Sequence, residues 1–142
     1  IIRLGYLDAL KAFGVFEGSY FTFSKGIFDK RSIVKADITA KIFELNPLCI
    51  YTKDVYFEKL KEAIIQAKEE LHHLKGLSIF SFIHFDKLKD ILRVTNKKSA
   101  ALLIAENIRD KGIDSIFMAR HTSNVLSNEI EAAKFLYKHK LI

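Results

Sequence analysis

The sequence contains very few of the residues that build disulfides, thiolate metal sites and sharp turns. Its 142 residues include one Cys, one Pro, one Met and no Trp. Cys49 can form neither an internal disulfide nor a Cys-rich zinc site, and its place between Leu48 and Ile50 favours a small core residue. No apolar run approaches the roughly 20 residues that a membrane-spanning helix needs.

Motifs for catalysis and metal binding are also missing. The chain has no G-x-S-x-G elbow, no P-loop and no G-x-G-x-x-G turn. Its five histidines show no His-x3-His spacing, and the adjacent His72 and His73 would point about 100° apart on a helix. Ser123 near His121 does not lie in a recognisable nucleophile turn. We therefore expect no catalytic or metal site, no cofactor and no small-molecule substrate.

The residues that are present indicate a folded protein. Hydrophobic residues make up 49% of the chain and aromatic residues 12%, with twelve Phe. That composition excludes a disordered tail. A chain of this length fits one domain, or a domain with an extension, and can bury a sizeable core.

The N-terminal part is divided by glycines and by the single proline. A short amphipathic helix is predicted over Gly5–Phe13 and is stopped by Gly14. Strand-like runs follow at Ser19–Ser24 and Ser32–Ile38. Asn46 before Pro47 predicts a turn and a module boundary. We expect residues 1-50 to be an N-terminal extension or a small α+β module.

The strongest helix signal covers Asp54–Leu74. An apolar stripe at helical spacing consists of Tyr56, Leu60, Ile64, Ala67, Leu71 and Leu74. Such a helix either covers a core or docks on a partner, and core is the favoured reading of this stripe.

The remaining 66 residues predict strands alternating with helices. The helix Asn96–Lys111 has apolar residues at i, i+3, i+4 and i+7, and Gly112 stands where a helix C-cap needs positive φ. The full predicted order is strand Ser78–Phe85, connection Asp86–Asp90, strand Ile91–Thr95, helix Asn96–Lys111, strand Ile113–Arg120 and helix Ser127–His139. The fold class is therefore predicted as α/β, with a small β-β-α-β-α sheet in the C-terminal half. This sheet and the helix at 54-74 would form one domain over residues 51-142.

The positive charge is unevenly distributed. The chain carries 23 Lys or Arg against 17 Asp or Glu, a net charge of +6. Residues 77–142 hold eleven of those basic residues and seven of the acidic ones. A basic surface favours the phosphate backbone of nucleic acid through counterion release.

The stretch Ile104–Ile113, IAENIRDKGI, resembles the segment from helix to strand in a family of 5S rRNA-binding ribosomal proteins, the eighteenth in large-subunit numbering. The family has an Ala-Glu pair, a basic residue and then Lys-Gly-Ile. Here those are Ala105, Glu106, Arg109 and the run Lys111-Gly112-Ile113. The resemblance covers about residues 77-142, including the segment SIFSFIHFDKLKDILRVTNK.

This resemblance implies a structural, non-enzymatic component of the large ribosomal subunit that contacts ribosomal RNA and neighbouring ribosomal proteins. Divergence and an added N-terminal region point to an organellar, mitochondrial ribosome, and otherwise to a cytoplasmic one. The family's hairpin and the loop after its last strand face RNA. The corresponding RNA-binding candidates are Lys87, Lys89, Arg93, Lys97, Lys98, Arg120 and His121.

Two other readings stay open. The order of elements and the run Met118–Thr122 also resemble the C-terminal domain of an archaeal tRNA guanine-26 dimethyltransferase, which would make the chain a tRNA-binding accessory domain. Alternatively, the helix Asp54–Leu74 is the docking surface of a protein-interaction module that binds no RNA.

Overall fold

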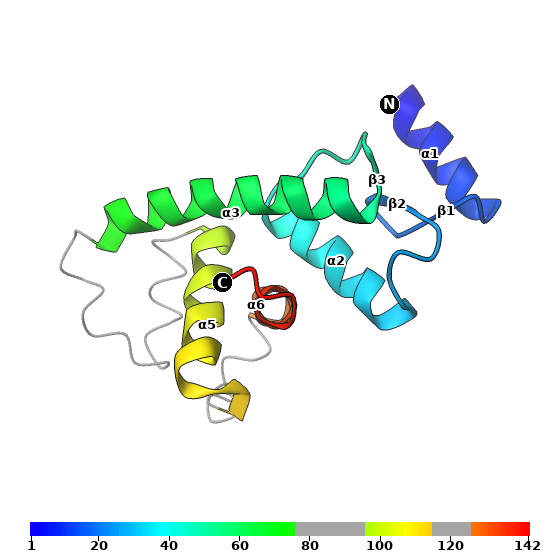
Figure 1. Ribbon diagram of the computed structural model, residues 1–142. Coiled ribbons are helices and arrows are strands. Elements are labelled where there is room, and N and C mark those ends of the chain that lie inside the picture. The colour runs from blue at the N-terminus through cyan, green and yellow to red at the C-terminus, as the bar shows by residue number, and fades with distance from the viewer. Residues whose placement is uncertain (76–95, 115–125) are drawn as a thin grey trace. The chain divides into compact units, whose positions relative to one another are not determined.

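The computed structural model describes residues 1–75, 96–114 and 126–142 (Figure 1). This part divides into two compact units, Ile1–Ala63 and Ile64–Ile142, and their boundary falls inside one long helix. We call them unit 1 and unit 2.

Unit 1 begins with helix α1, Ile2–Ala12, and holds a three-stranded sheet (Figure 1). The strands are β1 at Phe16–Glu17, β2 at Thr22–Ser24 and β3 at Ile50–Tyr51, in the order β1-β2-β3. β1 pairs with β2 antiparallel, and β2 pairs with β3 parallel. The parallel pair requires a crossover, and helix α2, Lys30–Ile42, lies in that connection.

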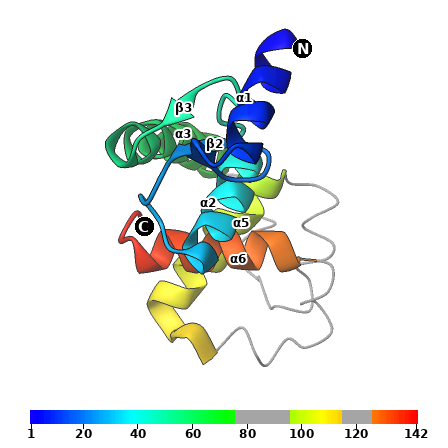
Figure 2. The same cartoon turned by 90° about the vertical axis from the view of Figure 1, so that its right-hand side faces the viewer.

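Unit 2 is helical in its described part. Helix α3, Lys53–Lys75, starts in unit 1 and continues into unit 2. Helix α5, Lys97–Lys111, and helix α6, Ser127–Lys138, pack against each other, as two views show (Figures 1 and 2).

The predicted location of the sheet is wrong. The sheet that the structure shows lies between residues 16 and 51, in the N-terminal half, and the chain there is a mixed α/β arrangement rather than an extension. The strands predicted at 78–85 and 91–95, and residues 115–120 of the third, fall outside the described residues. Ile113 and Asp114, also predicted as strand, form a short 3₁₀ turn.

The run Ser32–Ile38 is helical, not a strand as predicted. Asp29 caps α2, because its Oδ1 accepts the backbone N–H groups of Arg31 and Ser32 at 2.9 and 2.8 Å. The buried residues Ser32, Ala36, Thr39 and Ala40 then follow helical spacing. The N-cap and the helical spacing of the buried residues outweigh the strand propensity of the β-branched residues in this run.

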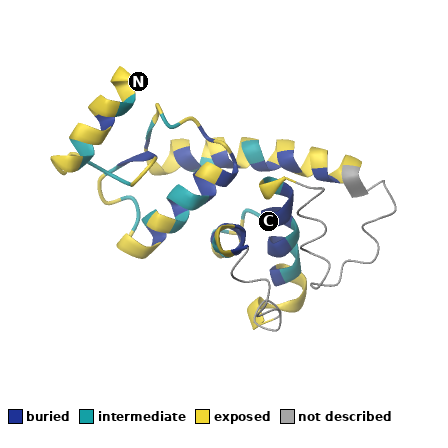
Figure 3. Ribbon diagram, turned by 180° about the vertical axis from the view of Figure 1, so that it is seen from behind, coloured by how far each residue is buried: buried dark blue, intermediate teal, exposed yellow. Residues whose placement is uncertain are grey.

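The helix predictions were more accurate than the strand predictions. Helices at the positions of α1, α3, α5 and α6 are confirmed, and α1 begins three residues earlier than predicted. Gly112 ends α5 with φ +84°, as predicted. The stripe Tyr56, Leu60, Ile64, Ala67 and Leu71 is buried, so these residues are core, and Leu74 lies outside the described side chains (Figure 3).

Aromatic rings form the core of unit 1. Phe23 is fully buried, and its ring lies 5.9 Å from Phe28, 6.1 Å from Tyr51 and 5.5 Å from Tyr56. Two of these pairs are edge-to-face and the pair with Tyr51 is tilted, arrangements that the ring quadrupoles favour. The phenol of Tyr56 donates to the carbonyl of Ala36 at 2.9 Å, which ties α3 to α2 inside unit 1.

Cys49 is exposed, so its prediction as a core residue is wrong. It follows a turn in which the side chain of Asn46 accepts the N–H of Leu48 at 2.9 Å. The turn predicted at Asn46 and Pro47 is therefore confirmed, and it places Cys49 at the surface before β3. The predicted domain limit at residue 50 stays a prediction.

Candidate functional site

The two predicted RNA-binding residues that the structure describes begin helix α5. Asn96 caps this helix, because its Oδ1 accepts the N–H of Ser99 at 2.9 Å. The amide Nδ2 of Asn96 also donates to Oε2 of Glu70 at 3.4 Å, so the start of α5 lies beside α3 within unit 2. Lys97 and Lys98 therefore stand at a fixed place, in the first turn of a capped helix.

The electrostatics of that turn are unusual for a helix start. Lys97 is exposed, Lys98 is half-buried, and the turn has no acidic residue. The N-terminus of a helix carries partial positive charge, so a solvent-exposed cation there is unfavourable by about 0.3–1 kcal/mol. Lys97 and Lys98 add two positive charges, and Glu70 beside Asn96 offsets one of them. The remaining positive charge suits an anion such as a phosphate backbone.

Helix α2 provides an instructive comparison. Its first turn also has two basic residues, Lys30 and Arg31, and no acidic one. Its cap, however, is Asp29, whose carboxylate lies directly at the helix start. The cap of α5 is the neutral Asn96, and the carboxylate of Glu70 on α3 accepts the amide of that cap. Of these two helix starts, α5 is the one whose cap residue is itself uncharged.

The other predicted RNA-binding residues cannot be placed. Lys87, Lys89, Arg93, Arg120 and His121 lie outside the described residues. Whether they gather near Lys97 and Lys98 stays a prediction.

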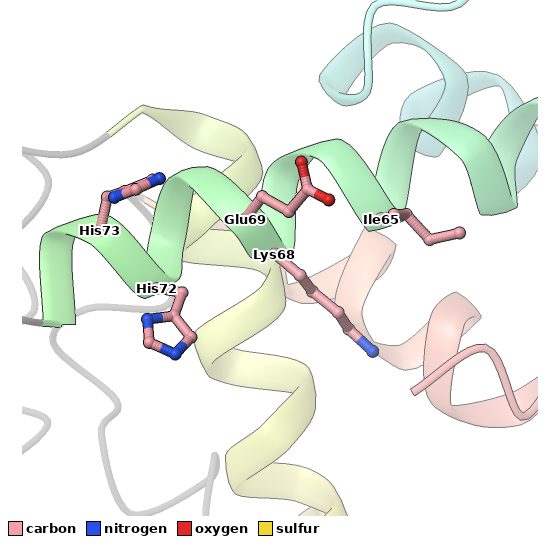
Figure 4. A pocket seen from close by; sticks show the side chains of 5 residues that line it. All are labelled: Ile65, Lys68, Glu69, His72 and His73. Carbon is pink, nitrogen blue, oxygen red and sulfur yellow. The ribbon is translucent and has the colours of Figure 1, made fainter.

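A surface hollow of about 510 Å³ lies along α3 in unit 2, where sequence analysis assigned no site. The described side chains that line it are Ile65, Lys68, Glu69, His72 and His73 (Figure 4). Glu69 and His73 project to one side of the helix, and Lys68 and His72 project to the other. The i, i+4 spacing of each pair was visible in the sequence. Because its lining includes both an acidic and a basic side chain, the hollow favours neither anionic nor cationic ligands.

The two histidines of this hollow do not converge on one point. His72 and His73 point apart in Figure 4, as two adjacent helical residues must. Among residues 1–75, 96–114 and 126–142, no three His, Cys, Asp or Glu side chains come together as a ligand set. His139, the C-cap of α6, contacts Phe135 with ring centroids 4.4 Å apart and the ring planes tilted by 47°.

A second hollow, of about 420 Å³, lies in unit 1 between the turn before β2 and helix α2. Its one ionisable lining group is Asp37, whose carboxylate accepts the backbone N–H groups of Ser19, Tyr20 and Phe21 at 3.3, 3.3 and 2.8 Å. Three such donors fix the position of the carboxylate. Asp37 therefore holds the turn before β2.

The turn that Asp37 holds depends on Gly18. Gly18 has φ +109°, and a Cβ at this position would collide with the carbonyl oxygen of Phe21. The same turn carries Tyr20, whose ring lies 5.5 Å from the Nζ of Lys41. These contacts make the turn a rigid connection to β2.

In the described part of the chain, no helix is both long enough and apolar enough to cross a membrane. Comparison with protein-family models, curated proteins and solved structures finds no match to this chain. A functional assignment must therefore rest on the residues themselves.

Proposed function

We propose that the chain is an RNA-binding, non-catalytic component of the large ribosomal subunit that contacts ribosomal RNA and neighbouring ribosomal proteins. The observation that carries this proposal is the pair Lys97 and Lys98, at the start of a helix with a neutral cap. The same helix contains most of the stretch Ile104–Ile113 that resembles the 5S rRNA-binding family.

Three physical arguments support RNA as the ligand of this helix start. Lysines at a helix N-terminus cost folding free energy, and a bound phosphate reverses that cost. The basic excess of the whole chain lies largely in residues 77–142, which include α5 and α6. Binding that neutralises phosphates gains free energy through counterion release.

The proposed particle is an organellar ribosome, in mitochondria. The divergence of the sequence from the ribosomal family and the additional module of unit 1 support this location. Purification of the large subunit from mitochondria, with detection of the chain by mass spectrometry, tests it. Recovery of the chain only in fractions without ribosomes would contradict it.

The binding test reverses the charge of the site in a Lys97→Glu/Lys98→Glu double variant. Binding to purified large-subunit ribosomal RNA is measured over a range of salt concentrations. If both lysines contact phosphates, the slope of log K against log salt should fall by about two units. The affinity at low salt should fall with it.

The matched control is Lys30→Glu/Arg31→Glu, which makes the same change in charge in the first turn of α2. Its affinity and salt slope should equal those of the unchanged chain. Equal loss in both variants would indicate attraction by net charge alone and would contradict a site at α5. Tighter binding of transfer RNA than of ribosomal RNA would favour the tRNA-binding alternative.

A further inference from the structure

Helix α1 is attached to unit 1 by one face. Leu7 is buried with 1% of its surface exposed, and Leu4 and Leu10 are half-buried. Polar contacts fix both ends of the helix: Nε of Arg3 donates to the carbonyl of Leu48 at 2.9 Å, and Nζ of Lys11 donates to the carbonyl of Ser19 at 2.6 Å. These contacts determine which face of α1 points outward.

The outward face of α1 is free of charge. Ile2, Gly5, Tyr6, Ala9 and Phe13 are all exposed and lie within about 100° on the helix surface. The exposed fractions of the three large side chains are 93% for Ile2, 59% for Tyr6 and 82% for Phe13. We call these five residues the outer stripe, which lies on the largely exposed α1 of Figure 3.

The charged residues of α1 lie off the outer stripe. Arg3 and Lys11 are engaged in the contacts with unit 1, and Asp8 pairs with Lys11 at 2.8 Å. The outer stripe therefore presents an uncharged, apolar surface on a helix that has polar residues elsewhere. Contiguous apolar patches of this kind mark interaction sites.

The pattern of side-chain sizes identifies the partner. In an antiparallel pair of α1 helices centred between Leu7 and Asp8, residue i lies opposite residue 15 − i. Tyr6 then faces Ala9 of the second copy, and Ile2 faces Phe13 of the second copy. A large ring meets a small residue twice across the two-fold axis, while Gly5 beside it permits close approach.

The area of the stripe fits a reversible dimer. Its exposed side chains offer on the order of 600 Å² per copy, so a pair buries less than ~1,200 Å², in the range of weak, reversible interfaces. The outer stripe has no charged side chain, so the pair brings no like charges of the stripe together.

We propose that the outer stripe of α1 is a homodimer interface in which a second copy of this chain packs its own α1 antiparallel. This interface is separate from the proposed RNA site on α5 and does not depend on RNA binding. The dissociation constant should be on the order of 10 µM, because the buried area is small.

The test is sedimentation equilibrium of the whole chain at concentrations up to about 100 µM, an order of magnitude above the expected constant. The unchanged chain should approach twice its monomer mass. Ala9→Glu places a charge at the centre of the interface in each copy and should weaken dimerisation by more than about 100-fold. Ala9 is exposed, so this variant should keep the circular dichroism and the melting curve of the folded protein.

The matched control is Asp8→Asn, which changes the charge of the same helix by one unit away from the stripe and should leave dimerisation unchanged. A chain that is monomeric at every concentration would overturn the proposal. A dimer that Ala9→Glu leaves intact would overturn it as well. Flotation of both proteins with vesicles of phosphatidylcholine and phosphatidylserine provides a further arm. If the chain is monomeric and binds these vesicles, and Ala9→Glu abolishes that binding, the homodimer proposal is overturned and the outer stripe binds a membrane surface instead.

Discussion

The two units bury different kinds of side chain. Unit 1 fills its core with rings, and Phe21, Phe23, Tyr51 and Tyr56 are each exposed by 1% or less. In the described part of unit 2, α5 and α6 bury small residues, among them Ala100, Ala101, Ala105, Ala132 and Ala133.

This difference follows from the elements that each unit has to hold together. The strands of unit 1 are only two or three residues long, so the ladder of backbone hydrogen bonds contributes little. Large rings contribute buried area and fix the orientation of the sheet instead. The helices α5 and α6 satisfy their own backbones, and alanines allow them to approach closely. Unit 1 should therefore be sensitive to lost volume, and unit 2 to added volume.

The largest effect is expected from Phe23→Ala in unit 1. The ring is fully buried among three other rings, so its removal leaves a cavity and should lower the free energy of unfolding by about 3–5 kcal/mol. Urea unfolding followed by tyrosine fluorescence reports mainly on this unit, because four of the five tyrosines, Tyr6, Tyr20, Tyr51 and Tyr56, lie in it. Tyr137→Phe in the background removes the signal of unit 2.

Val34→Ala is the control for this loss of volume, because Val34 is 57% exposed on α2. Its effect should stay within about 0.5 kcal/mol. If Phe23→Ala were no more harmful than Val34→Ala, the aromatic cluster would not be what stabilises unit 1.

In unit 2 the informative change is an added side chain, Ala101→Leu. Ala101 is fully buried on α5, so three extra carbons should force the helices apart and destabilise the unit by about 1–3 kcal/mol. Thermal unfolding followed by far-ultraviolet circular dichroism measures the loss. Lys111→Leu places the same leucine side chain at an exposed position of this helix and removes one cation from its last turn, so the loss should stay below about 1 kcal/mol. Equal melting of the two variants would remove the contrast between the units.

The same contrast explains what the sequence could predict. Helices carry a local signature, so the apolar periodicity and the C-cap at Gly112 identified α5 to within a residue. The stripe on α3 identified the buried face in the same way. For these elements, local propensity and tertiary packing point to the same answer.

One strand of the sheet is confirmed, since β2 at Thr22–Ser24 falls within the strand-like run Ser19–Ser24. The sheet as a whole could not be predicted, because β1 and β3 are too short to show a pattern. β3 consists of Ile50 and Tyr51 alone, and it becomes a strand through pairing with β2, a partner about 28 residues away in sequence. The turn before β2 depends on Asp37, a residue on another element whose contacts with Ser19–Phe21 have no local signal. For the candidate RNA site, the sequence indicated Lys97 and Lys98, but the neutral cap and the contact with Glu70 that position them emerge only from the structure.

The smallest effect is expected from Tyr51→Phe in unit 1. This substitution separates the contribution of a ring's volume from that of its hydroxyl group. The phenol of Tyr51 donates to the carbonyl of Asn46 at 2.7 Å, and Tyr51→Phe keeps the ring while removing this hydrogen bond. At neutral pH the variant should lose about 0.5–1.5 kcal/mol in urea unfolding.

The pH dependence of this loss provides an independent check. Burial raises the pKa of Tyr51 from 10.0 to about 12. The unfolded chain therefore loses the phenol proton first, so the stabilisation from Tyr51 is complete below pH 10 and declines between pH 10 and 12. Tyr51→Phe has no proton to lose at this position, so its deficit should shrink as the pH rises above 10. Burial also raises the pKa of Tyr56, and the negative charge of an ionised Tyr51 raises it further. Tyr51→Phe removes that last contribution, so the titration of Tyr56 adds to the measured difference. A deficit that stayed constant over this range would mean that the ionised phenol of Tyr51 is tolerated in the folded state, and that the core of unit 1 is open to water at this ring.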